Sequence, residues 1–170
     1  MIAGTDRIVF RPVSVSQESF RKACGHFATG VAILATRTAD GTPHGLTINS
    51  FASLSLDPPL VMVAIAHSSA QLSAFDVAPS FTVSFLREDQ QDLSRRFAQV
   101  QQERFSGILW TEGSTGAPLI QGAIASLECR IAQHIDLGDH RVLIGEAVEA
   151  HISAGRPLVF FRGVYASLPE

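Results

Sequence analysis

Residues 45–59, GLTINSFASLSLDPP, decide how the rest of this 170-residue chain is interpreted. In an extended segment, side chains two residues apart lie on the same face. On that pattern one face is nearly all aliphatic, with Ser50 as its one polar member. The opposite face carries hydroxyls and a carboxamide around a single aromatic ring, and its members are Thr47, Asn49, Phe51, Ser53 and Ser55.

The polar face of this predicted strand is neutral. No charged residue precedes Asp57, whereas a solvated face usually carries Lys, Glu or Arg. Short neutral donors and acceptors at fixed spacing suit a neutral heteroaromatic ring or a phosphate ester. The alternative is a strand rich in Thr and Ser whose polar face meets water. In either case Pro58 and Pro59 end the strand, because consecutive prolines cannot continue a hydrogen-bonded ladder.

Length and composition predict a single domain with a sizeable core. A chain of 170 residues buries roughly 70% of its unfolded surface. Hydrophobic residues make up 46% and charged residues 17%, with a mean hydropathy of +0.20, and such apolar chains often bury further surface in an oligomer. A net charge of −3 and a pI near 6.0 argue against nucleic acid or an anionic membrane as a partner.

The cysteines and the N-terminus predict a cytoplasmic protein. Cys24 and Cys129 lie far apart without metal-ligand spacing, which favours a reducing compartment. The chain lacks a signal-peptide pattern, and no apolar run approaches the ~20 residues that a membrane span needs. We expect residues 1–16 to be a loose lead-in and residues 17–170 to form the domain.

The remaining patterns predict many short strands and few helices. A first helix is expected from Ser16 to His26, in which residues at helical spacing form a core face made of Phe20, Ala23, Cys24 and Phe27. Further helices are expected at 71–75 and 90–102, and strands at 31–36, 60–66, 81–86, 123–135, 141–148 and 157–168. This balance favours a mainly antiparallel barrel with a helix or two packed outside.

Some of these segments carry more specific expectations. Residues 31–36 and 60–66 are short apolar runs typical of strands buried on both faces, while 81–86 alternates like a half-buried strand. Residues 105–116 are Gly-rich and are expected to form a mobile loop. Asp40 and Gly41 give the signal of a hairpin turn.

Two polar segments are candidate sites. Ser68 or Ser69 is a possible N-cap for the helix at 71–75, where free amides and hydroxyls suit an anion, although an ordinary cap is the more common case. Asp139 and His140 occupy a turn between two strands, and loops on rigid scaffolds often carry function. Asp139 either orients the His140 ring or simply shapes the turn.

The motifs that the chain lacks narrow its chemistry. It has no G-x-G-x-x-G after a strand, no P-loop lysine motif and no G-x-S-x-G elbow. Its six histidines show no metal-ligand spacing. A Rossmann dinucleotide site, a P-loop, a serine-hydrolase site and a metal centre are therefore unsupported.

Taken together, several motifs resemble one family, the short-chain flavin reductases that serve two-component flavin-dependent monooxygenases. They are FRKACGHFATG at 20–30, residues 45–59, Phe97-Ala98, LECR at 127–130, GDH at 138–140 and IGE at 144–146, in the order seen in that family. Each motif alone is weak, but the combination is specific and spans residues 17–168.

The resemblance implies an FMN-binding split β-barrel with Greek-key topology and a few flanking helices, working as a homodimer with the flavin near the subunit interface. It implies flavin contacts along one strand, at the phosphate end of the flavin and near a helix. Ser53, on the polar face of the predicted strand, is a further candidate. The candidate flavin-binding residues are Gly45, Leu46, Thr47, Ile48, Asn49, Ser50, Ser53, Ala66, His67, Ser68, Ser69, Phe97 and Ala98. The positions that match His140 and Tyr165 are placed at the nicotinamide nucleotide.

The chain departs from the family pattern at two places. Many relatives have Asn where this chain has Ser84, and some have a lysine in the segment that matches residues 67–70. A phosphate without lysine would rely on hydroxyls, backbone amides and an arginine such as Arg87 or Arg96. The choice between FMN and FAD, and between NADH and NADPH, stays open.

We therefore predict an NAD(P)H-dependent flavin reductase that transfers a hydride to FMN or FAD and supplies reduced flavin, by diffusion, to a partner monooxygenase. The cofactors carry the chemistry, and the protein binds and orients them. Two alternatives are a split-barrel oxidase of the pyridoxamine-phosphate type and a flavin-binding dimer module without turnover. The basic phosphate pocket of such an oxidase is hard to assemble from one lysine and scattered arginines.

Overall fold

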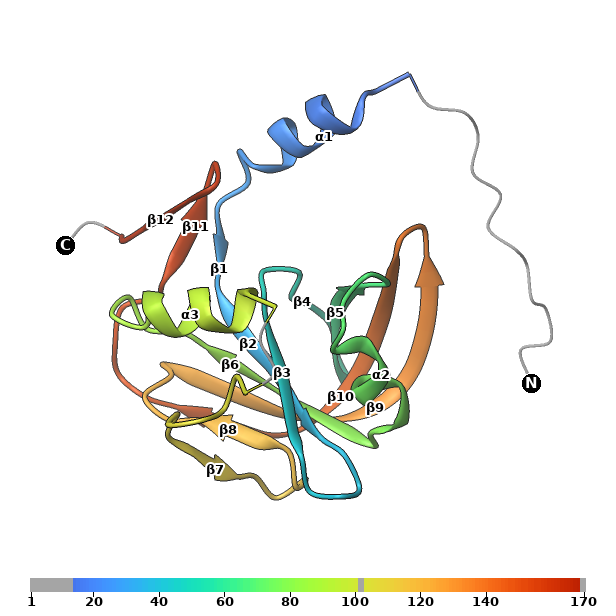
Figure 1. Cartoon of the computed structure of the whole chain (residues 1–170), viewed down its shortest axis with the longest axis vertical. Helices are drawn as coiled ribbons and strands as arrows, with labels where there is room; N and C mark the ends of the chain where they lie inside the picture. Colours follow the sequence, from blue (N-terminus) through green and yellow to red (C-terminus); the bar gives the residue numbers. More distant parts are fainter. Residues whose placement is uncertain (1–13, 101–102, 169–170) are drawn as a thin grey trace.

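Strands dominate the computed structural model, which describes residues 14–100 and 103–168 (Figure 1). The helices in this part of the chain are α1 (Gln17–Cys24), α2 (Leu72–Val77) and α3 (Gln91–Ala98). The strands are β1 (Thr29–Gly30), β2 (Ala32–Arg37), β3 (Pro43–Ile48), β4 (Ala52–Leu56), β5 (Pro59–Ala66), β6 (Ser80–Phe85), β7 (Trp110–Glu112), β8 (Pro118–Ile120), β9 (Ala125–Leu137), β10 (His140–Ile152), β11 (Val159–Phe161) and β12 (Val164–Ala166). None of these helices is long and apolar enough to cross a bilayer.

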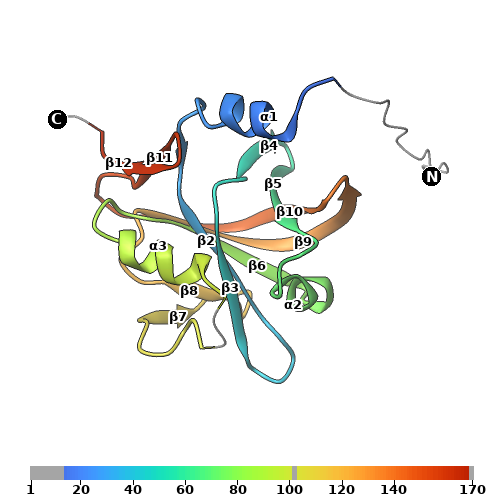
Figure 2. The same ribbon diagram turned by 45° about the horizontal axis from the view of Figure 1, so that its top comes forward.

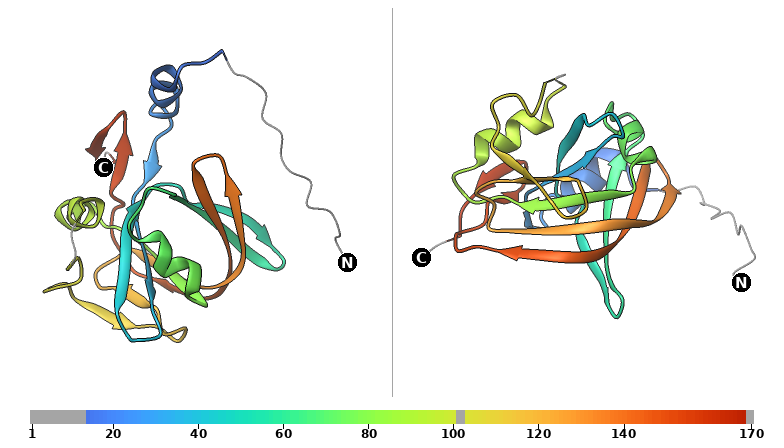
Figure 3. Two further views of the ribbon diagram at one scale, coloured as in Figure 1. Left: turned by 45° about the vertical axis from the view of Figure 1, so that its right-hand side comes forward. Right: turned by 90° about the horizontal axis from the view of Figure 1, so that it is seen from below.

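Seven strands form one antiparallel sheet in the order β3-β2-β6-β9-β10-β5-β4. Among the strands of this sheet, β6, β9 and β10 follow one another along the chain and lie side by side. The strand before them, β5, lies beside β10, which gives a Greek-key arrangement. Only residues 49–51 separate the two edge strands β3 and β4, so the sheet curls round on itself (Figures 1 and 3). Two small sheets, β1-β11-β12 and β7-β8, lie beside it. The predicted split barrel with Greek-key topology is confirmed.

The core lies on both faces of β2, as the apolar run at 31–36 predicted. Ala32 and Leu34 belong to one cluster with side chains of β5, β6 and β10. Ile33 and Ala35 alternate with them and belong to a second cluster with side chains of α3 and β8. Burial on both faces makes β2 a central strand that fixes the positions of β3 and α3.

The expected half-burial of 81–86 is wrong, because β6 is buried along both faces. Phe81 and Val83 point into the first cluster. The polar residues between them are also buried, and each is bonded to the β7-β8 region: Thr82 Oγ1 donates to the carbonyl oxygen of Pro118, and Ser84 Oγ accepts from the N–H of Ile120 at 3.2 Å. The alternating pattern of residues 81–86 therefore belongs to a strand whose polar face is covered by the β7-β8 hairpin.

The predicted strand through residues 45–56 is two strands. The two-residue alternation holds in β3, where Leu46 and Ile48 pack on the first cluster. It fails after Ile48, because residues 49–51 leave the ladder and carry the chain from one sheet edge to the other. Ser50 ties this crossing to β5: its Oγ donates to the Ala64 carbonyl at 2.9 Å and accepts from the Ala64 N–H at 3.0 Å.

The first helix begins after Ser16, its N-cap, whose hydroxyl accepts from the N–H of Ser19. The predicted core face is wrong within this chain. No residue of α1 is buried, and Phe20 and Phe27 are 59% and 78% exposed. Figure 1 shows α1 lying apart from the sheet, at the start of the segment that leads into β1.

Four further expectations need correction. The loop at 105–116 contains β7, which pairs with β8, and the strand at 157–168 is the β11-β12 hairpin. The strand β5 alternates between buried and half-buried residues instead of being buried on both faces. The N-cap residue of α2 is Gln71 and not Ser68 or Ser69, although the Ser69 hydroxyl accepts from the N–H of Gln71 at 3.3 Å.

The turns were predicted correctly. Asp40 and Gly41 join β2 to β3, and Gly138 and Asp139 join β9 to β10. Of the predicted lead-in, residues 1–13 lie outside the described residues, so the domain bounds stay a prediction.

Candidate functional site

The polar side of β3 lies against α3. Thr47 Oγ1 donates a 2.6 Å hydrogen bond to the carbonyl oxygen of Ser94. Nearer the start of the strand, the N–H of Gly45 donates to Gln71 Oε1 at 3.3 Å. Asn49, just past the end of β3, is exposed, and its amide has no hydrogen-bond partner among the described residues. The end of β3 therefore offers an unused amide beside a hydroxyl whose proton is directed at α3.

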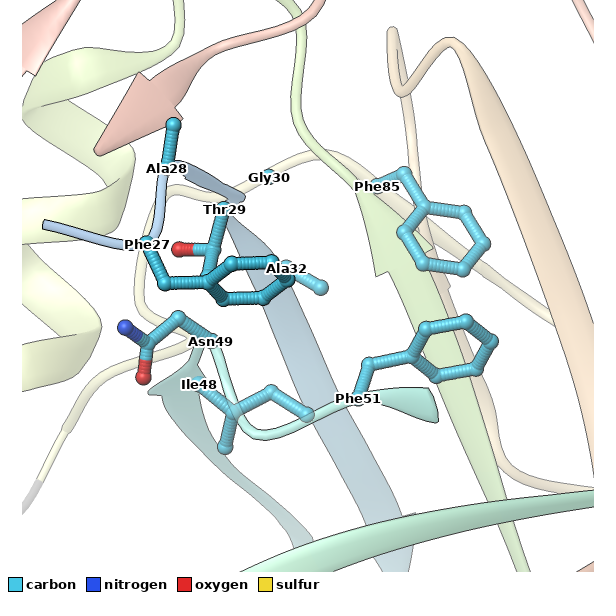
Figure 4. Close-up of a pocket in the computed structure, with 9 residues that line it drawn as sticks. All are labelled: Phe27, Ala28, Thr29, Gly30, Ala32, Ile48, Asn49, Phe51 and Phe85. Carbon is cyan, nitrogen blue, oxygen red and sulfur yellow. The ribbon is translucent and has the colours of Figure 1, made fainter. Parts of the chain in front are cut away.

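Two cavities meet at this end of β3, and Ile48 and Asn49 line both of them. The first, of about 180 Å³, is completed by residues of α3, β11 and β12: it is lined by Val31, Thr47, Ile48, Asn49, Ser94, Ala98, Phe160 and Tyr165. The second, of about 290 Å³, is lined by Phe27, Ala28, Thr29, Gly30, Ala32, Ile48, Asn49, Phe51 and Phe85 (Figure 4).

The second cavity has aromatic walls and few polar atoms. The rings of Phe51 and Phe85 meet edge to face with centroids 4.8 Å apart, and Figure 4 shows them together on one side of the cavity. Asn49 lies on the opposite side. The hydroxyl oxygen of Thr29 is buried and has no hydrogen-bond partner within the described part of the chain. Apolar walls with a few unused polar atoms are typical of a small-molecule site.

Gly45 is needed for packing. A Cβ at this position would lie 3.0 Å from Cε1 of Phe97 and 3.1 Å from both the Leu34 carbonyl oxygen and the ring of Phe105. The buried Arg104 donates from Nη1 to the Gly45 carbonyl at 2.7 Å. Phe97 is fully buried under this contact, whereas Ala98 lines the first cavity. Of these two helix residues, only Ala98 is placed to touch a ligand.

A second group of predicted residues lies at the other end of β5. Ala66 pairs with His140 in the β5-β10 ladder, and the N–H of His67 donates to the Asp139 carbonyl at 2.9 Å. The segment that contains Ser68 and Ser69 is therefore adjacent to the β9-β10 turn. Neither this segment nor Ser53, which is exposed on β4, lines the two cavities described above.

This second group is rich in charge. His140 Nδ1 lies 2.7 Å from Asp139 Oδ1, and His67 Nε2 lies 3.0 Å from Asp136 Oδ1. The hydrogen bond with His140 lowers the pKa of Asp139. Arg141, and after it His67, lower the pKa of Asp136. Asp139 thus contacts the His140 ring directly, as one of the two sequence interpretations required.

Tyr165 belongs to the first cavity. Its hydroxyl lies 2.8 Å from Ser94 Oγ, and its ring meets Phe160 edge to face at 5.4 Å. The structure does not bring Tyr165 and His140 together in one chain: β12 and the β9-β10 turn lie on opposite sides of the molecule (Figures 1 and 2). The two residues predicted at the nicotinamide nucleotide therefore belong to different corners of the barrel.

The arginines considered for a phosphate differ in their partners. Arg87 is held by the Asp89 carboxylate through Nε at 2.7 Å and Nη2 at 2.8 Å. Arg96 donates only to backbone carbonyls, those of Glu103 and Ser106, and its buried Nε has no partner among the described residues. Arg96 is therefore the better candidate of the two for an anion.

Two residues of this region, Ser94 and Arg104, were not predicted from the sequence. Ser94 is three residues before Phe97, and both lie on the buried face of α3, so helical spacing was a signal that was available for Ser94. Nothing in the local sequence marks Arg104, which reaches Gly45 from 59 residues away. Burial lowers the pKa of its guanidinium.

Comparisons with known proteins identify the class. The family model described as "Flavin reductase like domain" matches residues 24–169. The FMN reductase (NADH) SmoA of Agrobacterium fabrum is 42% identical over 157 residues, which are 92% of this chain and 89% of that protein. The HsaB reductase subunit of a flavin-dependent monooxygenase from Rhodococcus jostii is 37% identical, with 91% and 80% covered.

Solved structures agree with these sequence relatives. Nitrilotriacetate monooxygenase component B from Mycobacterium thermoresistibile superposes with a TM-score of 0.86 at 37% identity, covering 90% of this chain and 87% of that one. The Streptomyces globisporus NADH:FAD oxidoreductase SgcE6, in complex with NAD and FAD fragments, gives a TM-score of 0.85 at 34% identity, with 90% and 93% covered.

The chain belongs to the flavin reductase family. It is an NAD(P)H:flavin oxidoreductase, and the predicted recognition, fold class and enzyme class are confirmed. These matches favour the reductase over the pyridoxamine-phosphate oxidase and over a binding module without turnover. A flavin and a nicotinamide nucleotide are the small molecules that its site must hold.

Proposed function

We propose that this protein binds flavin along the end of β3, reduces it with NADH, and releases it to a partner monooxygenase. The observation that carries the proposal is the pair of cavities that meet at Asn49, whose amide is free. The neutral groups beside it suit the uncharged polar edge of a flavin ring. Thr47 and Asn49 are the proposed polar contacts, and Ile48 lies between them as the apolar one.

The task of the protein in this reaction is orientation. When bound, the flavin accepts the hydride at N5 from C4 of the nicotinamide, with the rings within about 3–3.5 Å of each other. The residues of β3 hold one ligand, and the Tyr165 wall of the first cavity is the proposed contact for the other. No side chain is required as an acid or base in this step, and neither Thr47 nor Asn49 is ionisable.

Arg96 and the segment after β5 are the proposed phosphate contacts. Arg96 lacks a carboxylate partner in the described part of the chain, and Ser68 and Ser69 offer hydroxyls without a net charge. The relatives' names include both an FMN reductase and an NADH:FAD oxidoreductase. We propose NADH as the electron donor because both of those names specify it. Titration of FMN and FAD against NADH and NADPH decides each choice.

We also propose that the protein is a homodimer in the cytoplasm. An amphipathic helix gains most of its stability from packing its apolar face, yet α1 buries no residue and exposes Phe20, and Phe27 just after the helix is exposed as well. We expect a homodimer interface that includes this face and buries on the order of 2,000 Å² or more in total. Sedimentation at micromolar concentration tests the dimer, and a mass near 18.2 kDa for active protein would contradict it.

Transfer by diffusion predicts that flavin behaves as a substrate. Catalytic amounts of protein should reduce a large excess of flavin under anaerobic conditions, with NADH oxidation followed at its absorbance band. Failure to oxidise NADH with either flavin would overturn the proposed function. Reduction limited to one flavin per chain would overturn the release step alone and leave a tightly bound cofactor.

A further inference from the structure

Ser94 makes two contacts in two directions from the middle of α3, although it is fully buried. Its backbone carbonyl accepts from Thr47 Oγ1 at 2.6 Å, which ties α3 to β3. Its side-chain Oγ lies 2.8 Å from the hydroxyl of Tyr165, which ties α3 to β12. One buried residue thus contacts both walls of the first cavity.

No strand pairing joins those walls directly. The strand β3 is an edge of the seven-stranded sheet, and β12 is an edge of the three-stranded sheet β1-β11-β12. Ladder hydrogen bonds fix the spacing of neighbouring strands within a sheet, but they do not connect β3 with β12. The ladders connect the two strands only by way of β2, β1 and β11, so the separation of their facing side chains also depends on side-chain contacts, and Ser94 supplies a directional one.

The orientation of the Tyr165 ring matters because Tyr165 lines two cavities. The first is the 180 Å³ cavity that is also lined by Thr47 and Asn49. The other is a hollow of about 400 Å³ that is also lined by Glu88 and Asp89. The ring is packed edge to face on Phe160, and the Arg95 guanidinium lies 5.7 Å from its centroid, but neither contact is a directional bond to the hydroxyl. The bond to Ser94 fixes the hydroxyl end of the ring.

We propose that Ser94 is a positioning residue, which sets the separation between the flavin-binding strand and the tyrosine wall on which the nicotinamide nucleotide lies. The proposal rests on the proposed function. Hydride transfer needs two rings held within about 3–3.5 Å, and a shift of 1 Å at such a site can slow a reaction about 100-fold. A buried residue that contacts one wall through its carbonyl and the other through its hydroxyl is suited to hold such a distance.

The variant Ser94→Ala isolates the side-chain contact. It keeps the backbone bond to Thr47 and loses only the bond to Tyr165. We expect the flavin Kd to stay within about twofold of wild type, while the KM for NADH rises and single-turnover hydride transfer slows by about 5- to 20-fold. Tyr165→Phe should have the same effect, and the double variant should be no slower than either single variant, because all three lose one shared contact.

A matched control separates positioning from general stability. Ser126 Oγ donates a 3.1 Å bond to Ser84 Oγ, so Ser126→Ala also loses one buried hydroxyl pair, but away from the first cavity. Hydride transfer in this variant should match wild type. Equal slowing in Ser126→Ala and Ser94→Ala would mean that Ser94 acts only through stability, and would overturn the proposal.

A second readout is independent of turnover. Tyr165 is the single tyrosine of the chain, so 3-fluorotyrosine labelling gives one ¹⁹F resonance. Ser94→Ala should shift and broaden it, and Ser126→Ala should not. An unchanged resonance, or a shifted one with wild-type hydride transfer, would overturn the positioning role. Wild-type protein that fails to reduce flavin would overturn the proposed function instead, and the resonance would then decide alone whether Ser94 fixes Tyr165.

Discussion

Two corners of the barrel carry the predicted site residues, and they differ in charge. The neutral corner consists of Thr47, Asn49, Ser94 and Tyr165. The charged corner consists of Asp76, Asp136, Asp139, Arg141 and the histidines at 67 and 140. The neutral corner surrounds a cavity and leaves an amide unused, whereas the groups of the charged corner are paired with one another.

The difference indicates which corner is prepared for a ligand. In the charged corner Arg141 contacts Asp76 at 2.6 Å and Asp136 at 2.8 Å, and these hydrogen bonds raise the pKa of its guanidinium. A ligand there would have to displace existing pairs. In the neutral corner a ligand would satisfy Asn49 without breaking any bond among the described residues. This difference supports the proposed place of the flavin ring in the neutral corner, and a variant of His140 tests the charged corner.

The largest expected effect is steric, at Gly45. Gly45→Val places a branched side chain against Phe97 and the Leu34 carbonyl, where even a Cβ is 3.0–3.1 Å away, and should destabilise the fold by about 3 kcal/mol. Gly138→Asn is the contrast in the charged corner, because a Cβ there meets nothing within 4 Å and Asn tolerates its φ of +61°. Urea unfolding measures both, and equal losses would contradict the packing role of Gly45.

The next effect concerns flavin binding. Asn49→Leu should weaken flavin binding by about 1–3 kcal/mol, because the polar edge of the ligand would lose its partner. Fluorescence titration of flavin measures the Kd. Gln133→Leu, which also replaces an exposed amide, is the control and should keep the wild-type Kd. Unchanged affinity in correctly folded Asn49→Leu protein would remove the neutral corner from the flavin site.

The variant His140→Ala tests whether the charged corner takes part in catalysis. If its ring contacts the nicotinamide nucleotide, kcat/KM for NADH should fall by about 5- to 30-fold, or roughly 1–2 kcal/mol, with flavin affinity unchanged. His134→Ala, whose ring nitrogen lies 3.2 Å from the Phe75 carbonyl oxygen, is the control. Wild-type kcat/KM in His140→Ala, alongside a loss in Tyr165→Phe, would assign the nucleotide to the neutral corner alone.

The smallest effect is electrostatic, at Asp136. Arg141 and His67 hold its pKa below the ordinary value of 3.8, so the ion pair stabilises the fold fully above that value and its contribution is lost as the pH falls through the lowered pKa. Asp136→Asn should lower Tm slightly at neutral pH, and the difference should shrink with added salt or acid. A Tm difference that persists under strongly acidic conditions would contradict this account.

Local pattern was sufficient for much of the fold. The apolar run before β3 predicted a strand buried on both faces, and the Asp40-Gly41 and Gly138-Asp139 pairs predicted the turns at which hairpins form. These features depend on side-chain period and turn chemistry within a few residues, which the sequence states directly. The combination of motifs also predicted the family, because the combination is specific to that family and its motifs extend over nearly the whole chain.

The sequence by itself thus determined the strand content, the hairpins, the family and the neutral character of β3. Only the tertiary structure decided that the chain leaves the ladder after Ile48, that Ser94 joins β3 to β12, and that His140 and Tyr165 lie in different corners. The physical reason is the sequence separation of the residues that come into contact. Alternation is a property of neighbouring residues, whereas Ser94 meets Thr47 and Tyr165 across 47 and 71 residues of chain, and no local pattern encodes such contacts.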